Sequence, residues 1–150
     1  QLSLPLQPVP LTFQSTTVLL LAALLGLRLG LASVLSYLGL GSLGLPVFAN
    51  FSGGAAILLH SSAGYLWGFI PAVLTTGYLL EKSAKNSSIR ILLAVIAGTV
   101  VLFACGLAWL SQSLGLYLAF HFGLAPFLLS ESIKMICLTL FIRFAIKRTA

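Results

Sequence analysis

Ile89-Arg-Ile-Leu-Leu-Ala-Val-Ile-Ala-Gly-Thr-Val-Val-Leu-Phe-Ala-Cys-Gly-Leu-Ala-Trp-Leu110 is the stretch that decides the class of fold, because its single charge, Arg90, stands at its start. A helix needs about 20 consecutive apolar residues to cross the ~30 Å hydrocarbon core of a bilayer. The stretch also lacks the alternating polar positions of a transmembrane strand. It therefore predicts a membrane-spanning helix.

Similar apolar runs lie on both sides of this stretch. They cover about Leu11 to Leu27, Leu29 to Phe48, Ala63 to Leu80 and Leu124 to Ile146. Hydrophobic residues make up 59% of the chain and charged residues 7%, against roughly 25% charged in soluble domains, and the mean hydropathy is +1.12. We therefore predict an all-α, polytopic membrane helix bundle with five spans, forming one membrane-embedded domain over residues 1–150.

The basic residues are divided unequally between the two sides of this bundle. Alternating spans place Arg28, the polar loop 81–90 and the C-terminus on one side, with all of the Lys and Arg residues except Lys134. The positive-inside rule makes that side cytoplasmic, which predicts a multi-pass protein of the cell membrane with lipid as its surroundings. Because topology explains the net charge of +6, nucleic acid is not a predicted partner. Gln1 then lies outside, and we expect one further helix upstream.

The outer loop from Gly39 to Gly54 is rich in glycine and aromatic residues and has no charge. Such a loop can fold back into the mouth of a membrane protein where protein covers its backbone. We expect it to close over a bound solute. Phe48 and Tyr65 flank the loop, and each either faces a ligand or belongs to an interfacial aromatic belt.

Catalytic and metal-binding patterns find no support. His60 and His121 are placed in outer loops and lack the spacing of metal ligands. The serines have no nucleophile-elbow context, and the glycine-rich segments do not follow the phosphate-binding pattern of nucleotide sites. We predict neither an enzyme nor a metal or cofactor site.

Glu131 and Lys134 are the charged residues inside the last apolar run. Charge at membrane depth is costly, so an acid and a base there usually mark a ligand site or an ion path. Three residues apart on a helix, their side chains lie on the same side. They suit a small, partly apolar solute that carries donors and acceptors. The alternative is a structural ion pair that orients the helix.

Several segments, in order along the chain, resemble one family. They are Ser3-Leu-Pro-Leu-Gln-Pro-Val-Pro-Leu-Thr-Phe-Gln14, Gly44-Leu-Pro-Val-Phe48, Ser52-Gly-Gly54, Gly64-Tyr-Leu-Trp-Gly-Phe69 and Pro126-Phe127 followed by Glu131 and Lys134. Together they resemble the BioY biotin transporters, which are substrate-binding S components of energy-coupling factor transporters and have six helices. The resemblance implies that this chain lacks the first of the six.

What the resemblance implies about function is specific. The expected substrate is biotin, and the expected partners are a transmembrane coupling subunit and paired ATPase subunits. Glu131 is expected to accept the ureido N–H groups, and Lys134 to bind either the ureido oxygen or the carboxylate. Further expected lining residues are Gln14, Phe48, Asn50 and Tyr65.

The chain departs from the family pattern at two places. Ser130-Glu131 stands where BioY sequences usually have Gly-Asp, and His60-Ser-Ser-Ala-Gly-Tyr65 replaces the usual Gly-Pro-Thr-Gly-Gly-Tyr. The extra methylene of Glu131 implies either an adjusted pocket or a weaker ligand contact, and the second change alters the contacts that the resemblance implies for the loop. Two alternatives therefore stay open: a non-transporting membrane assembly protein, and an S component for a different small vitamin.

Overall fold

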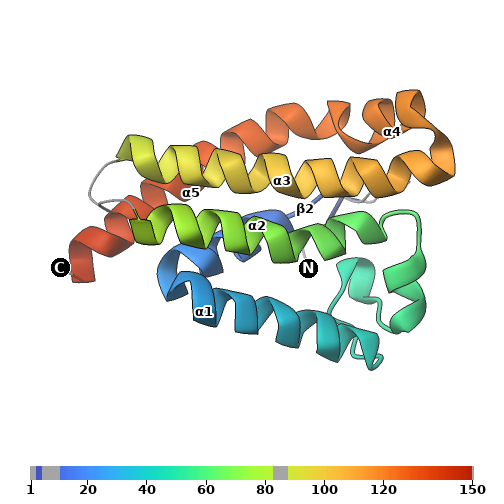
Figure 1. The fold of residues 1–150 in the computed structure, drawn as a ribbon, viewed down its shortest axis with the longest axis horizontal. Helices are drawn as coiled ribbons and strands as arrows, with labels where there is room; N and C mark the ends of the chain where they lie inside the picture. Colours follow the sequence, from blue (N-terminus) through green and yellow to red (C-terminus); the bar gives the residue numbers. More distant parts are fainter. Residues whose placement is uncertain (1–2, 5–10, 83–87, 150) are drawn as a thin grey trace.

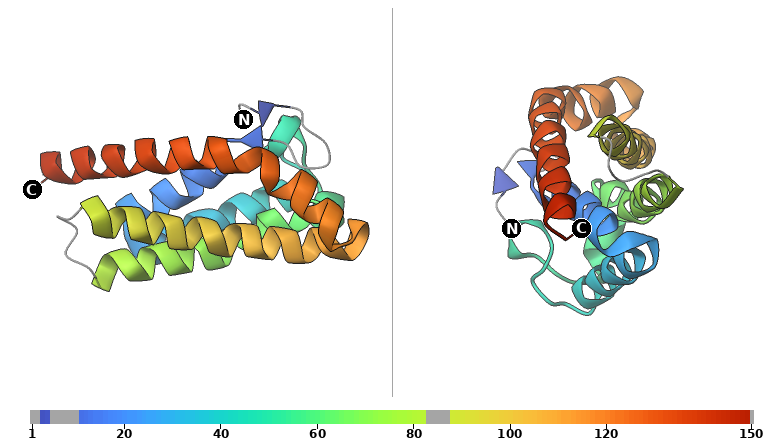
Figure 2. Two further views of the ribbon diagram at one scale, coloured as in Figure 1. Left: turned by 90° about the horizontal axis from the view of Figure 1, so that it is seen from above. Right: turned by 90° about the vertical axis from the view of Figure 1, so that its left-hand side faces the viewer.

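The computed structural model describes residues 3–4, 11–82 and 88–149, and helices make up its body (Figure 1). The long helices are α1 (Gln14–Ser42), α2 (Ala63–Lys82), α3 (Ser88–Leu114) and α5 (Leu128–Thr149). The shorter elements are β1 (Ser3–Leu4), β2 (Leu11–Thr12), α4 (Leu116–Gly123) and the 3₁₀ turns η1 (Ala49–Phe51), η2 (Ala55–Leu59) and η3 (Ala125–Phe127). Helix α2 packs against both α1 and α3, while α5 runs along α3 and the start of α1 (Figure 2).

Four helical segments of the described chain are long and apolar enough to cross a membrane. They are Gln14–Ser42, Ala63–Lys82, Ser88–Leu114 and Leu116–Ala145. The structure therefore confirms a helical membrane bundle with four helical segments of spanning length, while five crossings stay a prediction. The first two expected runs lie mostly within α1, which begins at Gln14 and ends at Ser42. The last apolar segment also begins at Leu116, before the expected Leu124, so that His121 lies in helix α4 rather than in a loop.

Helix α1 is broken at Gly26. This residue has φ 80° and ψ 178°, a conformation open essentially to glycine alone. The side chains of Gln14 and Tyr37, 23 residues apart, are joined by a hydrogen bond of 2.7 Å, whereas a straight helix would separate them by about 35 Å. The two arms of α1 therefore run back along each other (Figure 1), and the break between the first two expected runs, at Arg28, lies next to this reversal.

Small residues allow α2 to approach α3 closely. A Cβ atom added to Gly68 would lie 3.0 Å from the carbonyl oxygen of Leu102, and one added to Gly64 would collide with the Trp109 side chain. Glycines spaced four apart let membrane helices pack backbone to backbone. Gly64 and Gly68 therefore allow the close contact between α2 and α3.

A short antiparallel hairpin precedes α1 and departs from the all-α expectation. Ser3 pairs with Thr12 and Leu4 with Leu11. The intervening sequence carries Pro5, Pro8 and Pro10, and proline disfavours a continuous helix because it lacks an N–H donor. The hairpin leads the chain into α1 beside α5, which matters for the site described below.

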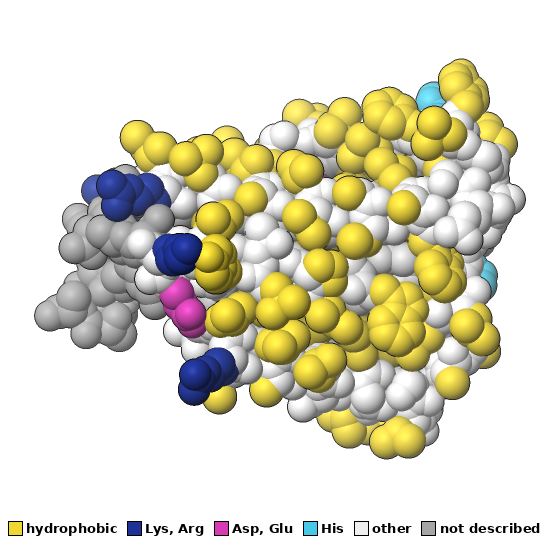
Figure 3. Space-filling model, viewed as in Figure 1, with side chains coloured by type: hydrophobic (Ala, Val, Ile, Leu, Met, Phe, Trp, Pro, Cys, Tyr) yellow, Lys and Arg dark blue, Asp and Glu magenta, His cyan; other side chains and the backbone are white. Residues whose placement is uncertain are grey.

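The surface suits a lipid environment over most of its length. Large apolar side chains are more than half exposed on several spans, among them Leu29, Leu93, Val100, Leu140 and Phe144. Soluble proteins rarely expose apolar surface this extensively. On the face shown in Figure 3, Lys and Arg side chains gather at one end and His at the other. Lys85 and the side chains of Lys147 and Arg148 lie outside the described residues.

The glycine-rich segment between α1 and α2 folds into η1 and η2. The N–H of Gly54 donates to the carbonyl of Gly41 at 2.7 Å, and the N–H of Phe48 donates to that of Ser52 at 3.0 Å. The first bond holds the segment against the end of the second arm of α1, and the second closes a turn within the segment. Its closing over a solute stays a prediction.

Candidate functional site

The first turn of α5 carries the candidate site. Leu124 has φ −123° and ψ −51°, which interrupts the helix after α4, and Pro126 stands at the start of η3. The chain then enters α5 at Leu128, with Glu131 in the first turn. A carboxylate is favoured there because the helix N-terminus carries partial positive charge.

Glu131 and Lys134 form a buried ion pair. Lys134 Nζ lies 2.7 Å from Glu131 Oε1, and the two residues are only 6% and 8% exposed. Attraction between two buried charges offsets their loss of hydration only when good geometry and further hydrogen bonds accompany it. This buried pair therefore needs further hydrogen bonds to be stable.

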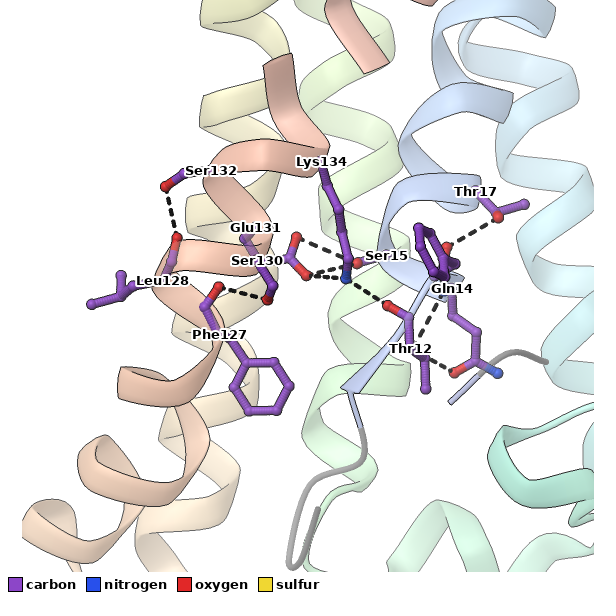
Figure 4. A network of polar contacts seen from close by, with 11 residues as sticks. Thr12, Gln14, Ser15, Thr17, Phe127, Leu128, Ser130, Glu131, Ser132 and Lys134 are labelled. Carbon is purple, nitrogen blue, oxygen red and sulfur yellow. Dashed lines mark hydrogen bonds and ion pairs between the residues drawn. The ribbon is translucent and has the colours of Figure 1, made fainter. Parts of the chain in front are cut away.

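The additional bonds come from the β2–α1 junction, far away in sequence (Figure 4). Lys134 Nζ donates to the carbonyl oxygen of Thr12 at 2.7 Å. The Ser15 hydroxyl is placed to donate to Glu131, 3.2 Å from Oε1 and 3.4 Å from Oε2. Phe13 covers the ammonium group with its ring centroid 5.3 Å from Nζ. Each charge thus has a second partner supplied by the segment from Thr12 to Ser15.

The pair keeps hydrogen-bonding capacity after these contacts. An ammonium has three donors and a carboxylate about four acceptor positions. The described contacts engage two donors of Lys134 and occupy chiefly Oε1 of Glu131. In the same turn of α1, and within the described chain, the buried Thr16 hydroxyl has no hydrogen-bond partner. The arrangement can accept a ligand that offers both N–H donors and an acceptor within a few ångströms.

Gln14 and Phe48 both contact Tyr37. Gln14 Nε2 donates to the Tyr37 hydroxyl at 2.7 Å, and the Thr12 hydroxyl donates to Gln14 Oε1 at 3.3 Å. The Tyr37 ring packs edge-on against Phe48, with centroids 5.4 Å apart. Two of the expected lining residues are therefore connected to the ion pair through Thr12 and Tyr37.

Tyr65 and Asn50 are placed differently. The Tyr65 hydroxyl donates to the carbonyl oxygen of Gly123 at 2.8 Å, in a buried contact that fastens α2 to the end of α4. Asn50 is an exposed residue of η1 with φ 58°. The described contacts bring neither side chain to Glu131, so a ligand role for both stays a prediction.

An apolar cavity of about 380 Å³ lies between α3 and α5. Glu131 is part of its wall, together with Phe103 of α3 and Phe127 of η3, whose ring centroids are 6.0 Å apart. The Glu131 side chain thus stands between an apolar space and the polar partners from α1. Pockets for small molecules typically combine apolar walls with a few placed polar groups.

Sequence reasoning missed four contributors, namely Thr12, Phe13, Ser15 and Tyr37. The Thr12 contact is made by a backbone carbonyl, which no residue type encodes. Ser15 meets Glu131 across 116 residues. No spacing rule predicts such a pair, and isolated Ser and Tyr residues are common in apolar runs.

Known proteins with similar sequences form a consistent group. A sequence model described as the BioY family matches residues 1–150. A biotin transporter BioY of Thermotoga maritima is 40% identical over 136 residues, covering 90% of this chain and 79% of that protein. A probable biotin transporter BioY of Pyrococcus horikoshii is 37% identical, covering 89% and 78% respectively.

A solved structure resembles the whole fold. It is the crystal structure of the S-component for biotin from an ECF-type ABC transporter, with a TM-score of 0.87 and 30% sequence identity. The match covers 96% of this chain and 79% of that one. The bundle described above is therefore an S-component fold. With the family match over its full length, this chain belongs to the BioY family.

Proposed function

We propose that this protein is the membrane-embedded, biotin-binding S component of an energy-coupling factor transporter and takes up biotin across the cell membrane. The observation that carries the proposal is the buried Glu131–Lys134 pair, which retains donors and acceptors in a chain whose family relatives are named biotin transporters. A binding role accounts for the pair better than bracing alone, because bracing does not require free hydrogen-bonding capacity.

The ureido group of biotin fits this pair. It carries two N–H donors beside one carbonyl acceptor, and the thiophane ring fused to it is apolar. Glu131 Oε1 and Lys134 Nζ lie 2.7 Å apart, so one ligand group that touches both must hold donor and acceptor side by side. This spacing favours the ureido oxygen over the distant valerate carboxylate as the partner of Lys134. Glu131 then accepts the ureido N–H groups.

The remaining wall of the site is assigned with the same reasoning. Gln14, next to Thr12 and Tyr37, offers an amide to the polar end of the ligand. Phe48 packs behind Tyr37 and supports that wall. Asn50, in η1, would reach the ligand only if the glycine-rich segment moves toward Glu131 on binding. Tyr65 lies in α2 with its ring against Phe103, which lines the same cavity as Glu131, so we place Tyr65 at the edge of the ligand site.

The topology we propose has five crossings and a cytoplasmic C-terminus. The reversal at Gly26 supports two crossings by α1, and the gathering of basic side chains at one end (Figure 3) supports the orientation. A cysteine at Arg90 should be shielded from an impermeant external label, and one at His60 should react. Both replacements belong in a chain without Cys105 and Cys137, and the opposite labelling pattern would reverse the orientation.

The transmembrane coupling subunit and ATPase subunits are proposed as partners because the solved structural relative belongs to an ECF-type transporter. Within the described residues, no three His, Cys, Asp or Glu side chains gather as a metal site. The buried charges of the described residues form one acid–base pair, Glu131 and Lys134. We therefore propose that other subunits supply the energy for uptake.

Equilibrium binding of labelled biotin to the purified protein tests the proposal. Unlabelled biotin should compete, while riboflavin and thiamine, which lack a ring with two N–H donors flanking one carbonyl, should not. Competition by another vitamin instead would identify an S component of different specificity. Absence of binding by every vitamin, with a normal melting transition, would favour the membrane assembly protein.

A further inference from the structure

The Ser15 hydroxyl makes an unusual contact for a hydroxyl in this protein. Apart from Thr76, which donates to the Ala94 carbonyl of α3, the Ser and Thr side chains described on the spans donate mostly to a carbonyl three or four residues earlier in their own helix, as Ser33 does to Leu29. This local bond is the common choice for a hydroxyl within a helix. Ser15 instead reaches the Glu131 carboxylate of α5, and the residue is 8% exposed.

The two oxygens of Glu131 are not equivalent as a result. Oε1 lies 2.7 Å from Lys134 Nζ and 3.2 Å from the Ser15 hydroxyl, whereas Oε2 has only the longer 3.4 Å approach of Ser15. A hydroxyl has a single proton and serves one oxygen at a time. Oε2 is therefore the oxygen with room for another donor.

Lys134 alone would leave the carboxylate plane loosely defined. The last torsion of a Glu side chain joins an sp³ to an sp² carbon and has a broad, roughly two-fold profile. One contact at Oε1 permits rotation about this bond, whereas a second donor that approaches the carboxylate from a different direction resists it. Ser15 supplies that second donor from another helix.

We infer that Ser15 is a positioning residue of the substrate site, whose hydroxyl fixes the Glu131 carboxylate so that Oε2 points its lone pairs at the N–H donors of the ligand. The inference rests on the proposed biotin site and adds to it a residue that acts through Glu131. It also gives the first turn of α1 a part in recognition. Preorganised acceptors lower the ordering cost of binding.

The test replaces Ser15 with Ala and measures biotin affinity and melting temperature on the purified full chain. Loss of the hydroxyl should weaken biotin binding about tenfold, the size expected when an interaction with a charged group is disturbed. Ser15→Thr, which keeps the hydroxyl, should recover most of the affinity. Ser33→Ala removes a hydroxyl from the same helix and should bind as the unchanged protein does.

Dependence on Glu131 separates positioning from general packing. In a Glu131→Gln background, the Ser15→Ala change should alter biotin affinity less than twofold, because no carboxylate remains to be oriented. Biotin methyl ester has an intact ureido ring. The Ser15→Ala change should therefore weaken its binding by the same factor as it weakens the binding of biotin. An equal loss in both backgrounds, or none in either, would overturn the role of Ser15.

Failure of the inference can be told apart from failure of the biotin site. If the unchanged protein binds no biotin, both fall together. If it binds biotin and Ser15→Ala does so equally well, only the positioning role is wrong. Should Ser15→Ala fail to fold, Ser15→Cys keeps the shape with a weaker donor, and unchanged affinity in that variant contradicts the inference.

Discussion

Glu131 and Glu81, the two acidic residues of the chain, both connect α1 to another helix, but they do so in different ways. Glu131 is buried and meets the side chains of Lys134 and Ser15. Glu81, exposed at the end of α2, accepts a hydrogen bond of 2.8 Å from the backbone N–H of Leu27. Ser15 and Leu27 are 12 residues apart, or about 18 Å along the first arm. The carboxylates thus serve separate regions.

The kind of partner distinguishes binding from bracing. Leu27 follows the break at Gly26, so its N–H lacks a partner within the second arm of α1, as at any helix N-terminus. Glu81 satisfies that fixed backbone group and thereby stabilises the turn. Lys134 and Ser15 are side chains with rotatable donors, and Lys134 has a donor to spare. Changes near Glu131 should therefore affect binding, and changes near Glu81 stability.

Lys134→Ala should have the largest effect on the binding side. We expect biotin affinity to fall by at least about 2 kcal/mol, or roughly 30-fold, because a charge-assisted bond is lost from a buried site. Lys82→Ala is the matched control, since Lys82 lies over the Tyr78 ring at the α2 terminus. Equilibrium binding measures both variants, and unaltered biotin affinity in Lys134→Ala would contradict the proposed site.

Gly26→Ala should have the largest effect on the bracing side. The φ of 80° and ψ of 178° are costly for any residue with a Cβ, by about 1–3 kcal/mol, and the new Cβ would lie 3.3 Å from Glu81 Oε1. Gly39→Ala is the matched control because its Cβ meets no atom within 4 Å. Melting temperature should fall in Gly26→Ala alone. Equal melting of the two variants would show that the break carries no strain.

The sequence predicts local features of both regions better than their connections. Apolar length identified the spans, and charge at membrane depth identified Glu131 and Lys134, because both signals lie within one helix. Neither signal indicates that Ser15 pairs with Glu131 or that Tyr37 joins Gln14 to Phe48. Those contacts depend on how α1 folds back at Gly26 and where it meets α5, which single residues do not encode.

Tyr65 illustrates the same limit from the opposite side. Its position beside a glycine-rich loop predicts a ring that either faces a ligand, which stays a prediction, or belongs to an interfacial aromatic belt. The structure fixes its hydroxyl on the Gly123 carbonyl and its ring 5.8 Å from that of Phe103. Buried tyrosines usually find such a partner for the hydroxyl, and which carbonyl is available depends on the packing of α4.

Glu131 substitutions should sharpen the comparison with a smaller effect. Glu131→Gln replaces one acceptor with a donor and should weaken biotin binding about tenfold, or ~1.4 kcal/mol. Glu131→Asp keeps the carboxylate and should retain binding, because BioY sequences usually have Asp at this position. Affinity and melting are measured on the same samples. If both variants melt lower and bind normally, the pair is structural.

Glu81→Ala should have the smallest effect, confined to stability. Losing the acceptor for a helix-terminal N–H costs about 1 kcal/mol, and Glu81→Gln, which keeps a carbonyl oxygen, should cost less. Biotin affinity should stay unchanged in both variants, because the contact with Leu27 lies about 18 Å along α1 from that with Ser15.

The double variant Glu81→Ala/Lys134→Ala makes this separation measurable. Distant sites without shared partners add within about 0.5 kcal/mol, so its affinity should equal that of Lys134→Ala and its melting temperature should fall by the sum of the single changes. A further loss of affinity in the double variant would mean that the turn at Gly26 and the site at Glu131 are coupled through the first arm of α1, and the two carboxylates would then belong to one functional unit.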